Sequence, residues 1–175
     1  MLGPTNKKTR KVERKMKTQK TKWIVYTAVI AAVYAVLTIS MAPISYGAIQ
    51  FRIPEVLTLL AFVNPHFAPG LIIGCFIANL FSPFGMIDAL IGTLATAIAV
   101  YAMRYAKNMW MASLAPTISN GIIVGIEVAV LCNLPIPETM MYVALGEFVV
   151  VTVIGVPVFK VISKKIQKYV EGVLA

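Results

Sequence analysis

The chain has 175 residues, of which 59% are hydrophobic and only 13% are charged, and its mean hydropathy is +0.82. A soluble globule with a polar surface could hardly accommodate that balance, so the composition excludes this class and predicts an integral membrane protein. A helix needs about 20 apolar residues to cross a bilayer. The chain therefore has room for about six crossings and for no separate soluble domain.

The positive charge is concentrated at the two ends of the chain. Residues 1–22 hold nine Lys or Arg and one acid, and four lysines lie between residues 160 and 168. The positive-inside tendency places both ends in the cytoplasm. We divide the chain into a basic cytoplasmic tail at 1–22, a membrane domain at 23–160 and a basic cytoplasmic end at 161–175. Attraction to anionic lipid accounts for such a tail beside a membrane span, so we expect a lipid bilayer and no nucleic acid as its partner.

Six membrane segments follow one another along the chain. The first runs from about Trp23 to Ala42 and is followed by an outer loop at 44–52. The others are expected at 53–63, 67–81, 84–104, 109–131 and 139–159. The second and third are short, and they flank the turn NPHFAP as a hairpin that enters and returns from the same side. The fold class is therefore an all-α integral membrane protein, a six-helix transmembrane bundle with both termini cytoplasmic.

Five acids interrupt the apolar region, namely Glu55, Asp88, Glu127, Glu138 and Glu147. A carboxylate in hydrocarbon costs a few kcal/mol, so such residues usually face a cavity, a partner or a ligand. With the expected helix directions, all five fall in the outer half of the membrane, and Glu147 lies roughly 14 Å deeper than Glu138 at the helical rise. Asn79 and Asn120 lie among them. The pattern predicts a polar pocket that opens outward and is closed inward.

Some of these residues also have a purely structural explanation. Arg52 and Glu55 could form a solvated ion pair, or they could belong with Gln50 to a lid that closes over a bound molecule. Asp88 could stabilise the first turn of its helix or contact a ligand. Asn120 could bind a ligand or hydrogen-bond to a neighbouring helix.

Two acids have no such structural explanation. No helix terminus lies near Glu147, so it should accept hydrogen bonds from a ligand or be protonated when the site is empty. Glu127 is the second acid of this kind, and it shares a helix face with Asn120, seven residues before it. Both are therefore candidate ligand contacts.

The chain contains no sequence motif of a hydrolase, a zinc enzyme or a nucleotide-binding protein. His66 has no second histidine or cysteine at metal-ligand spacing, and neither Cys75 nor Cys132 has metal or redox spacing. We therefore expect no enzyme, no catalytic residue, no metal site and no cofactor. The carboxylates and amides favour a small, planar solute rich in hydrogen-bond donors, such as a guanine-like ring or a cationic vitamin.

Small residues four positions apart occur on two of the expected helices, where they allow close approach of another helix. The alanines of the first helix could contact a separate subunit or pack within the bundle, and the glycines of the fifth have the same spacing. These residues are Ala28, Ala31, Ala32 and Ala35, and Gly121 and Gly125.

The sequence resembles the QueT family in the run FRIPEVLTLLAFVNPHFAPGLIIGCFIANLFSPFGMIDALIGTLAT and in the later segments SNGIIVG and ALGEF. Members of that family are substrate-binding membrane subunits, or S components, of energy-coupling factor (ECF) transporters for queuosine precursors. The resemblance covers about residues 24–160. It implies a multi-pass protein of a prokaryotic plasma membrane that captures a 7-deazaguanine, such as 7-aminomethyl-7-deazaguanine or queuine, from outside.

The resemblance also implies partners and site residues. The S component associates with a transmembrane coupling subunit (EcfT) and two ATPase subunits, and then topples in the membrane to release its ligand inward. In this scheme Ala28, Ala32 and Ala35 match the docking face. The positions that match the family's motifs are Arg52, Glu55, Asn79, Asp88, Asn120 and Glu147. An S component for another planar vitamin, an autonomous proton-coupled carrier and a scaffold protein remain the alternatives.

Overall fold

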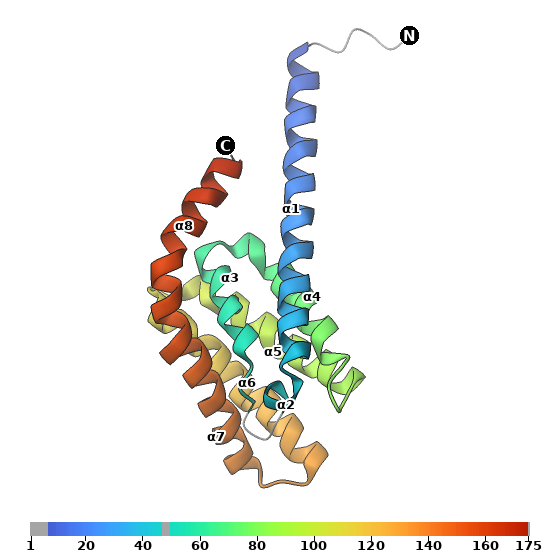
Figure 1. Ribbon diagram of the computed structural model, residues 1–175, viewed down its shortest axis with the longest axis vertical. Coiled ribbons are helices and arrows are strands. Elements are labelled where there is room, and N and C mark those ends of the chain that lie inside the picture. The colour runs from blue at the N-terminus through green and yellow to red at the C-terminus, as the bar shows by residue number, and fades with distance from the viewer. Residues whose placement is uncertain (1–6, 47–49, 175) are drawn as a thin grey trace.

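The computed structural model describes residues 7–46 and 50–174, and over these residues it is helical without any strand (Figure 1). The first half contains α1 (Lys7–Ser40), α2 (Ala42–Ser45), the 3-10 helix η1 (Ile53–Thr58), α3 (Leu59–Val63), the 3-10 helix η2 (Pro65–Phe67) and α4 (Ala68–Asn79). The second half contains α5 (Met86–Ala102), the 3-10 helix η3 (Met103–Tyr105), α6 (Met109–Cys132), α7 (Ile136–Glu147), the π-helix η4 (Phe148–Gly155) and α8 (Val156–Leu174).

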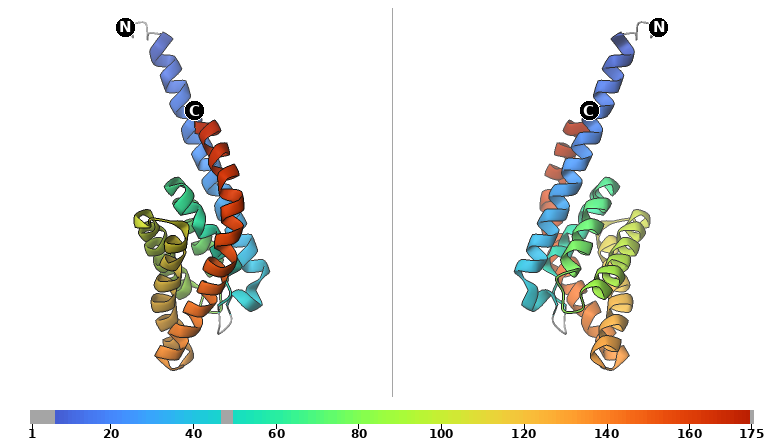
Figure 2. Two further views of the ribbon diagram at one scale, coloured as in Figure 1. Left: turned by 90° about the vertical axis from the view of Figure 1, so that its left-hand side faces the viewer. Right: turned by 90° about the vertical axis from the view of Figure 1, so that its right-hand side faces the viewer.

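These helices form a closed ring. Going round it, α1 packs on α4, α4 on α5, α5 on α6, and α6 on α7. The segment η1–α3 completes the ring, because η1 contacts both α1 and η4. The start of α1 and the end of α8 lie at the same end of the molecule, opposite α2 and the α6–α7 turn (Figures 1 and 2). The ring brings residues that are far apart in the sequence to one interior.

Among the described residues, four helical stretches are long and apolar enough to cross a membrane. They are Val12–Ser40, Met86–Tyr105, Met109–Cys132 and Ile136–Lys168. Two shorter apolar helical stretches, Ile53–Val63 and Pro65–Asn79, correspond to the expected second and third segments. An all-α protein with apolar helices of membrane-spanning length is thus confirmed, whereas six crossings stay a prediction.

The first and last helices extend beyond the predicted membrane domain. The first begins at Lys7 rather than near Trp23, and the last continues from Ile136 through η4 to Leu174. Lys, Arg, Gln and Glu are strong helix formers, and neither Pro nor Gly occurs between residues 7 and 22. The expected boundaries at residues 22 and 160 are therefore changes of composition within continuous helices. Residues 1–6 and 175 of the predicted basic ends lie outside the described residues.

Close packing between α6 and α7 uses the two glycines of the small-residue pattern. A Cβ atom on Gly121 would lie 2.8 Å from the Cβ of Ala144, and one on Gly125 would lie 2.7 Å from the Cα of Met140. Side chains at these positions would force the two helices apart. The interpretation that this pair packs within the bundle is confirmed.

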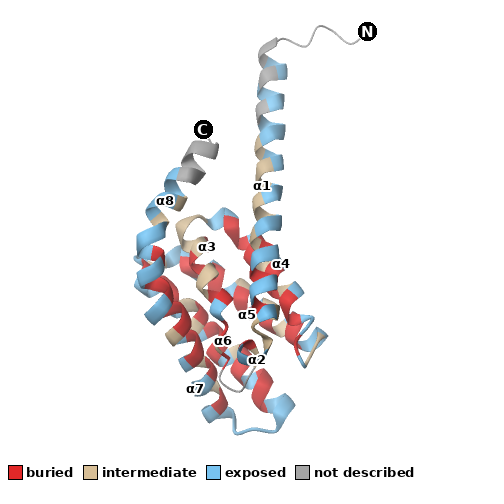
Figure 3. Cartoon of the chain, in the orientation of Figure 1, coloured by how far each residue is buried: buried red, intermediate tan, exposed pale blue. Residues whose placement is uncertain are grey.

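The outer surface of the ring is mostly apolar, while buried residues face inward (Figure 3). Large hydrophobic side chains such as Val25, Leu90, Ile118 and Met141 are more than half exposed. Such a surface is unfavourable in water but suits contact with lipid.

Candidate functional site

All eight polar residues that were expected to line a pocket are buried, and none exposes more than 5% of its surface. They come from the connection before η1, from η1 itself, and from α4, α5, α6 and α7. The set consists of Gln50, Arg52, Glu55, Asn79, Asp88, Asn120, Glu127 and Glu147. Glu138 differs, because it is exposed in the first turn of α7.

Arg52 joins the connection between α2 and η1 to the start of α5. Its Nη2 atom lies 3.4 Å from Oδ2 of Asp88, and its Nε donates a hydrogen bond of 3.4 Å to the carbonyl of Ser45. Asp88 also lies in the first turn of α5, where an acid interacts favourably with the helix dipole. A solvated ion pair between Arg52 and Glu55 is wrong, because both are buried and the guanidinium contacts Asp88 instead.

The same connection is held to α4 by Tyr46, whose hydroxyl donates a 2.6 Å hydrogen bond to the carbonyl of Ala78. The Arg52 guanidinium lies over its ring, 5.6 Å from the centroid. Burial raises the pKa of Tyr46, and the positive charge of Arg52 works in the opposite direction. These contacts fix the position of Arg52.

Glu55 is held by a residue that the sequence analysis did not select. The hydroxyl of Tyr34, on α1, donates a hydrogen bond to Oε1 of Glu55, and the hydroxyl of Thr58 donates to its backbone carbonyl at 2.5 Å. The second carboxylate oxygen, Oε2, has no hydrogen-bond partner within the protein. A tyrosine hydroxyl within an apolar helix usually has a polar partner. On this ground Tyr34 could have been selected from the sequence as a candidate site residue.

Asn79 connects α4 to α5. Its Nδ2 donates to the carbonyl of Asp88 at 3.2 Å and to Sγ of Cys75 at 3.4 Å. The amide lies directly against Gly92, where an added Cβ would come within 2.4 Å of Nδ2. Its Oδ1 has no partner within the protein. The local packing therefore directs the donor side of the amide to the protein and leaves the acceptor side unused.

Asn120 and Glu147 form the second direct contact between the side chains of two predicted site residues. Nδ2 of Asn120, on α6, donates a 2.7 Å hydrogen bond to Oε1 of Glu147, the last residue of α7. The π-helix η4 begins at the next residue, and short π segments within helices often occur at functional sites. Oδ1 of Asn120 and Oε2 of Glu147 have no partner within the protein.

Glu127 is buried on α6, and neither of its carboxylate oxygens has a hydrogen-bond partner within the protein. It interacts electrostatically with Asp88 and Arg52, while Glu147 interacts with Glu55 and Arg52. The positive charge of Arg52 thus attracts the four buried acids Glu55, Asp88, Glu127 and Glu147. If all four are ionised, the group has a formal charge of −3, which is unfavourable in a medium of low dielectric constant.

Among the described residues, the buried side-chain atoms without a hydrogen-bond partner number nine, and all are oxygens. Seven are carboxylate or amide oxygens, and the other two are hydroxyls. They are Oε2 of Glu55, Oδ1 of Asn79, Oδ1 of Asp88, Oδ1 of Asn120, Oε1 and Oε2 of Glu127, Oε2 of Glu147, Oγ of Ser45 and Oγ1 of Thr93. Buried polar atoms normally have partners, so this arrangement is suited to a ligand that brings several N–H donors.

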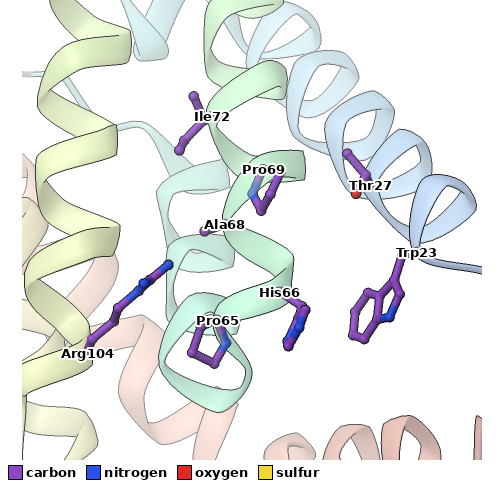
Figure 4. A pocket seen from close by; sticks show the side chains of 8 residues that line it. All are labelled: Trp23, Thr27, Pro65, His66, Ala68, Pro69, Ile72 and Arg104. Atoms are coloured by element: carbon purple, nitrogen blue, oxygen red, sulfur yellow. The ribbon is translucent and has the colours of Figure 1, made fainter. Parts of the chain in front are cut away.

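The eight polar residues, which form the polar cluster, are buried within the protein. Three surface hollows lie elsewhere on the described part of the chain: a groove between α1 and α4, a groove between α6 and α7, and a depression beside Trp23, His66 and Arg104 (Figure 4). None of the predicted ligand-binding residues lines these three hollows.

The alanines of the expected docking face lie on two sides of α1. Ala28 and Ala32 are exposed and line a shallow groove of about 540 Å³ together with Ile73 and Ile77 of α4. Ala35 is only 5% exposed and belongs to the core around Tyr34. The exposed small-residue surface therefore includes Ala28 and Ala32 and excludes Ala35.

Acids buried in the interior of an all-helical membrane protein are typical of proteins that bind or transport polar solutes or ions within the bilayer. The model of the QueT transporter family matches residues 24–164, and the chain belongs to this family. It is a multi-pass protein of the cell membrane, and the resemblance in the sequence is confirmed. The family is one of transporters, in keeping with the expectation that the protein is not an enzyme.

One curated relative is named the queuosine precursor transporter QueT of Lactococcus lactis subsp. cremoris (strain MG1363). It is 42% identical over 85 residues, which are 47% of this chain and 50% of the relative. The chain thus spans about half the length of the curated relative it matches. No solved structure matches the chain.

Proposed function

We propose that this protein captures a queuosine precursor with a 7-deazaguanine core, such as 7-aminomethyl-7-deazaguanine or queuine, from the extracellular side. The observation that carries the proposal is the group of seven unpartnered oxygens from η1, α4, α5, α6 and α7. A matched relative bears the name of a queuosine precursor transporter, which supports the same ligand class.

The chemistry of the ligand complements that of the cluster. A guanine-like edge presents a ring N–H beside an exocyclic amino group, and a carboxylate can accept from both at once. Glu147 is the acid for this role, because Asn120 fixes its orientation, Oε2 is free, and Oε1 keeps a second lone pair beside the one that accepts from Asn120. A protonated amine of the ligand would offset the excess of four acids over one arginine, and Glu127 has both oxygens available for it.

The orientation in the membrane follows from the charges. We place the ends of α1 and α8 in the cytoplasm, with residues 1–22 and 161–175 as basic cytoplasmic ends and six crossings between them. The concentration of Lys and Arg in these two segments supports this placement. The polar cluster then lies toward the extracellular side, near α2 and the connection that contains Gln50 and Arg52.

For energy coupling, we place the protein in an ECF importer as its S component, beside a coupling subunit and two ATPases. The exposed groove around Ala28 and Ala32 supports a docking role for α1, because small residues let another helix approach closely. Toppling of the subunit would then deliver the ligand inward. Copurification of the chain with a coupling subunit and ATPases tests this assembly.

Removal of single carboxylates tests the ligand site. We expect Glu147→Gln and Glu127→Gln each to weaken binding of 7-aminomethyl-7-deazaguanine at least tenfold, or about 1.4 kcal/mol, in calorimetry on the purified chain. Glu138→Gln is the matched control, because this acid lies on the same helix as Glu147 but is exposed. Unchanged affinity in both buried variants would contradict the proposed site.

A bulky residue on the exposed face of α1 tests docking separately. We expect Ala32→Trp to bind ligand normally and to abolish uptake in cells, because the indole ring blocks close approach of a partner helix. Ala102→Trp, at an exposed alanine of α5, is the control and should transport normally. Normal uptake by Ala32→Trp would contradict the docking face, and uptake driven by a proton gradient without ATPases would indicate an autonomous carrier.

A further inference from the structure

A hollow of about 550 Å³ lies between α1, η2, the start of α4 and η3, at the same end of the molecule as the chain termini (Figure 4). Its lining residues are Trp23, Thr27, Pro65, His66, Ala68, Pro69, Ile72 and Arg104. None of these residues belongs to the polar cluster, and none is acidic. The hollow is thus a second concave site with a different chemistry.

Nitrogen-bearing side chains flank the hollow on two sides. Arg104 reaches in from η3, and His66 and Trp23 face it across Pro65 and Ala68 (Figure 4). The rings of His66 and Trp23 stack with centroids 4.4 Å apart and planes inclined by 21°, while the Arg104 guanidinium lies 5.4 Å from the ring centroid of Tyr101. Arg104 has no acid among the residues that line the hollow, so an anion there meets one fixed positive charge without a competing carboxylate.

The rest of the hollow is mostly apolar, and it shares two lining residues with a groove of similar volume. Pro65, Ala68, Pro69 and Ile72 supply carbon surface. Trp23 and Thr27 also line the groove between α1 and α4, which continues along Ala28, Ala31 and Ala32 opposite Ile73 and Ile77. A positive charge beside a hollow that adjoins an apolar groove matches a molecule that has an anionic group and a hydrocarbon chain.

We propose that this surface is a binding site for an anionic phospholipid, with the headgroup phosphate beside Arg104 and one acyl chain in the α1–α4 groove while no partner helix is docked there. The predicted topology places Trp23 at the inner membrane interface, where amphipathic aromatic residues collect. Basic pockets between membrane helices bind anionic headgroups. An inorganic phosphate ion would contact the guanidinium but not the apolar surface of the hollow and the groove. A lipid would contact both, so the lipid is the better fit.

Fluorescence of Trp23 reports directly on the site. In a Trp110→Phe background, Trp23 is the remaining tryptophan. The full chain is reconstituted in vesicles in which brominated phosphatidylglycerol or brominated phosphatidylcholine replaces part of the lipid, and quenching gives the relative association constants. We expect phosphatidylglycerol to be preferred about fivefold, which corresponds to about 1 kcal/mol for one basic residue.

Two variants separate this site from general surface charge. Arg104→Gln should abolish the preference, whereas Lys164→Gln, which removes an exposed charge from α8 near the same end of the molecule, should keep it. Both side chains are exposed, and unchanged thermal unfolding would confirm that the variants fold. Equal quenching by the two lipids, an unchanged preference in Arg104→Gln, or an equal loss in Lys164→Gln would overturn the proposal. Loss of the preference on addition of inorganic phosphate at constant ionic strength would overturn the lipid assignment.

Discussion

The interior of the ring is divided into an apolar region and a polar region. The side chains of the apolar region are fully packed, whereas the polar region contains buried oxygens without hydrogen-bond partners. The apolar region includes Leu71 and Met103, both fully buried among other hydrophobic side chains. The polar region includes Glu55 and Glu147, which are as deeply buried but keep carboxylate oxygens without partners. Because an unpartnered buried oxygen destabilises the fold, the contrast supports the proposal that the first region maintains the structure and the second binds a ligand.

The largest effect is expected where a charge in the polar region loses its partner. Arg52→Gln leaves Asp88 buried without its guanidinium, and we expect the free energy of unfolding to fall by about 4 kcal/mol. Denaturant titration in detergent measures this change. Adding Asp88→Asn should restore part of the loss, since the double variant has no unpaired charge at this contact.

Arg104→Gln is the control for that comparison, because its guanidinium is exposed, and it should change stability by less than about 0.5 kcal/mol. Equal stability of Arg52→Gln and the unsubstituted protein would show that the Arg52–Asp88 contact, 3.4 Å in length, contributes nothing to folding. The polar region would then be held by its other contacts, such as the hydrogen bonds from Tyr34 to Glu55 and from Asn120 to Glu147.

In the apolar region, Leu71→Ala should lower the free energy of unfolding by about 3 kcal/mol, because truncation of a fully buried leucine leaves a cavity. The affinity of the folded protein for its ligand should stay the same, since Leu71 belongs to the apolar core. Leu90→Ala, at a leucine that is 60% exposed on α5, should have little effect on stability. A loss of affinity in Leu71→Ala without a loss of stability would remove the distinction between the two regions.

Much of the fold was predictable because hydropathy and helix length are properties of local sequence. Apolar runs identified the membrane helices, and Pro65 and Asn64 marked the turn between the short segments, where the Asn64 side chain accepts a hydrogen bond from the backbone N–H of His66. The helical ends of α1 and α8 were not expected, because basic composition was interpreted as a tail although these residues favour helix. The π-helix η4 has no compositional signal.

The candidate site was predictable residue by residue but not in its pairings. A carboxylate in an apolar run requires an explanation wherever it occurs, so Glu55, Glu127 and Glu147 could be selected from the sequence. The contacts of Arg52 with Asp88, 36 residues away, and of Asn120 with Glu147, 27 residues away, depend on how the ring closes. Local sequence contains no information about that closure.

Tyr34 belongs to both regions, and its substitution tests where they meet. It is 1% exposed in the apolar core around Leu71, yet its hydroxyl donates to Glu55. Tyr34→Phe keeps the ring and removes the donor, so Oε1 of Glu55 would join Oε2 as an unpartnered oxygen, and we expect a loss of about 1.5 kcal/mol in unfolding free energy.

Tyr142→Phe, which removes a hydroxyl from an exposed ring on α7, should change neither stability nor affinity. Ligand affinity of Tyr34→Phe, measured by calorimetry, then decides the role of the hydrogen bond. If Tyr34 orients Glu55 for a ligand, affinity should fall along with stability, and adding Glu55→Gln to Tyr34→Phe should cause little further loss of affinity because the two residues act as a unit. Additive losses of affinity in the double variant would show that Tyr34 acts independently of Glu55, and unchanged affinity in Tyr34→Phe would show that it serves the apolar core alone.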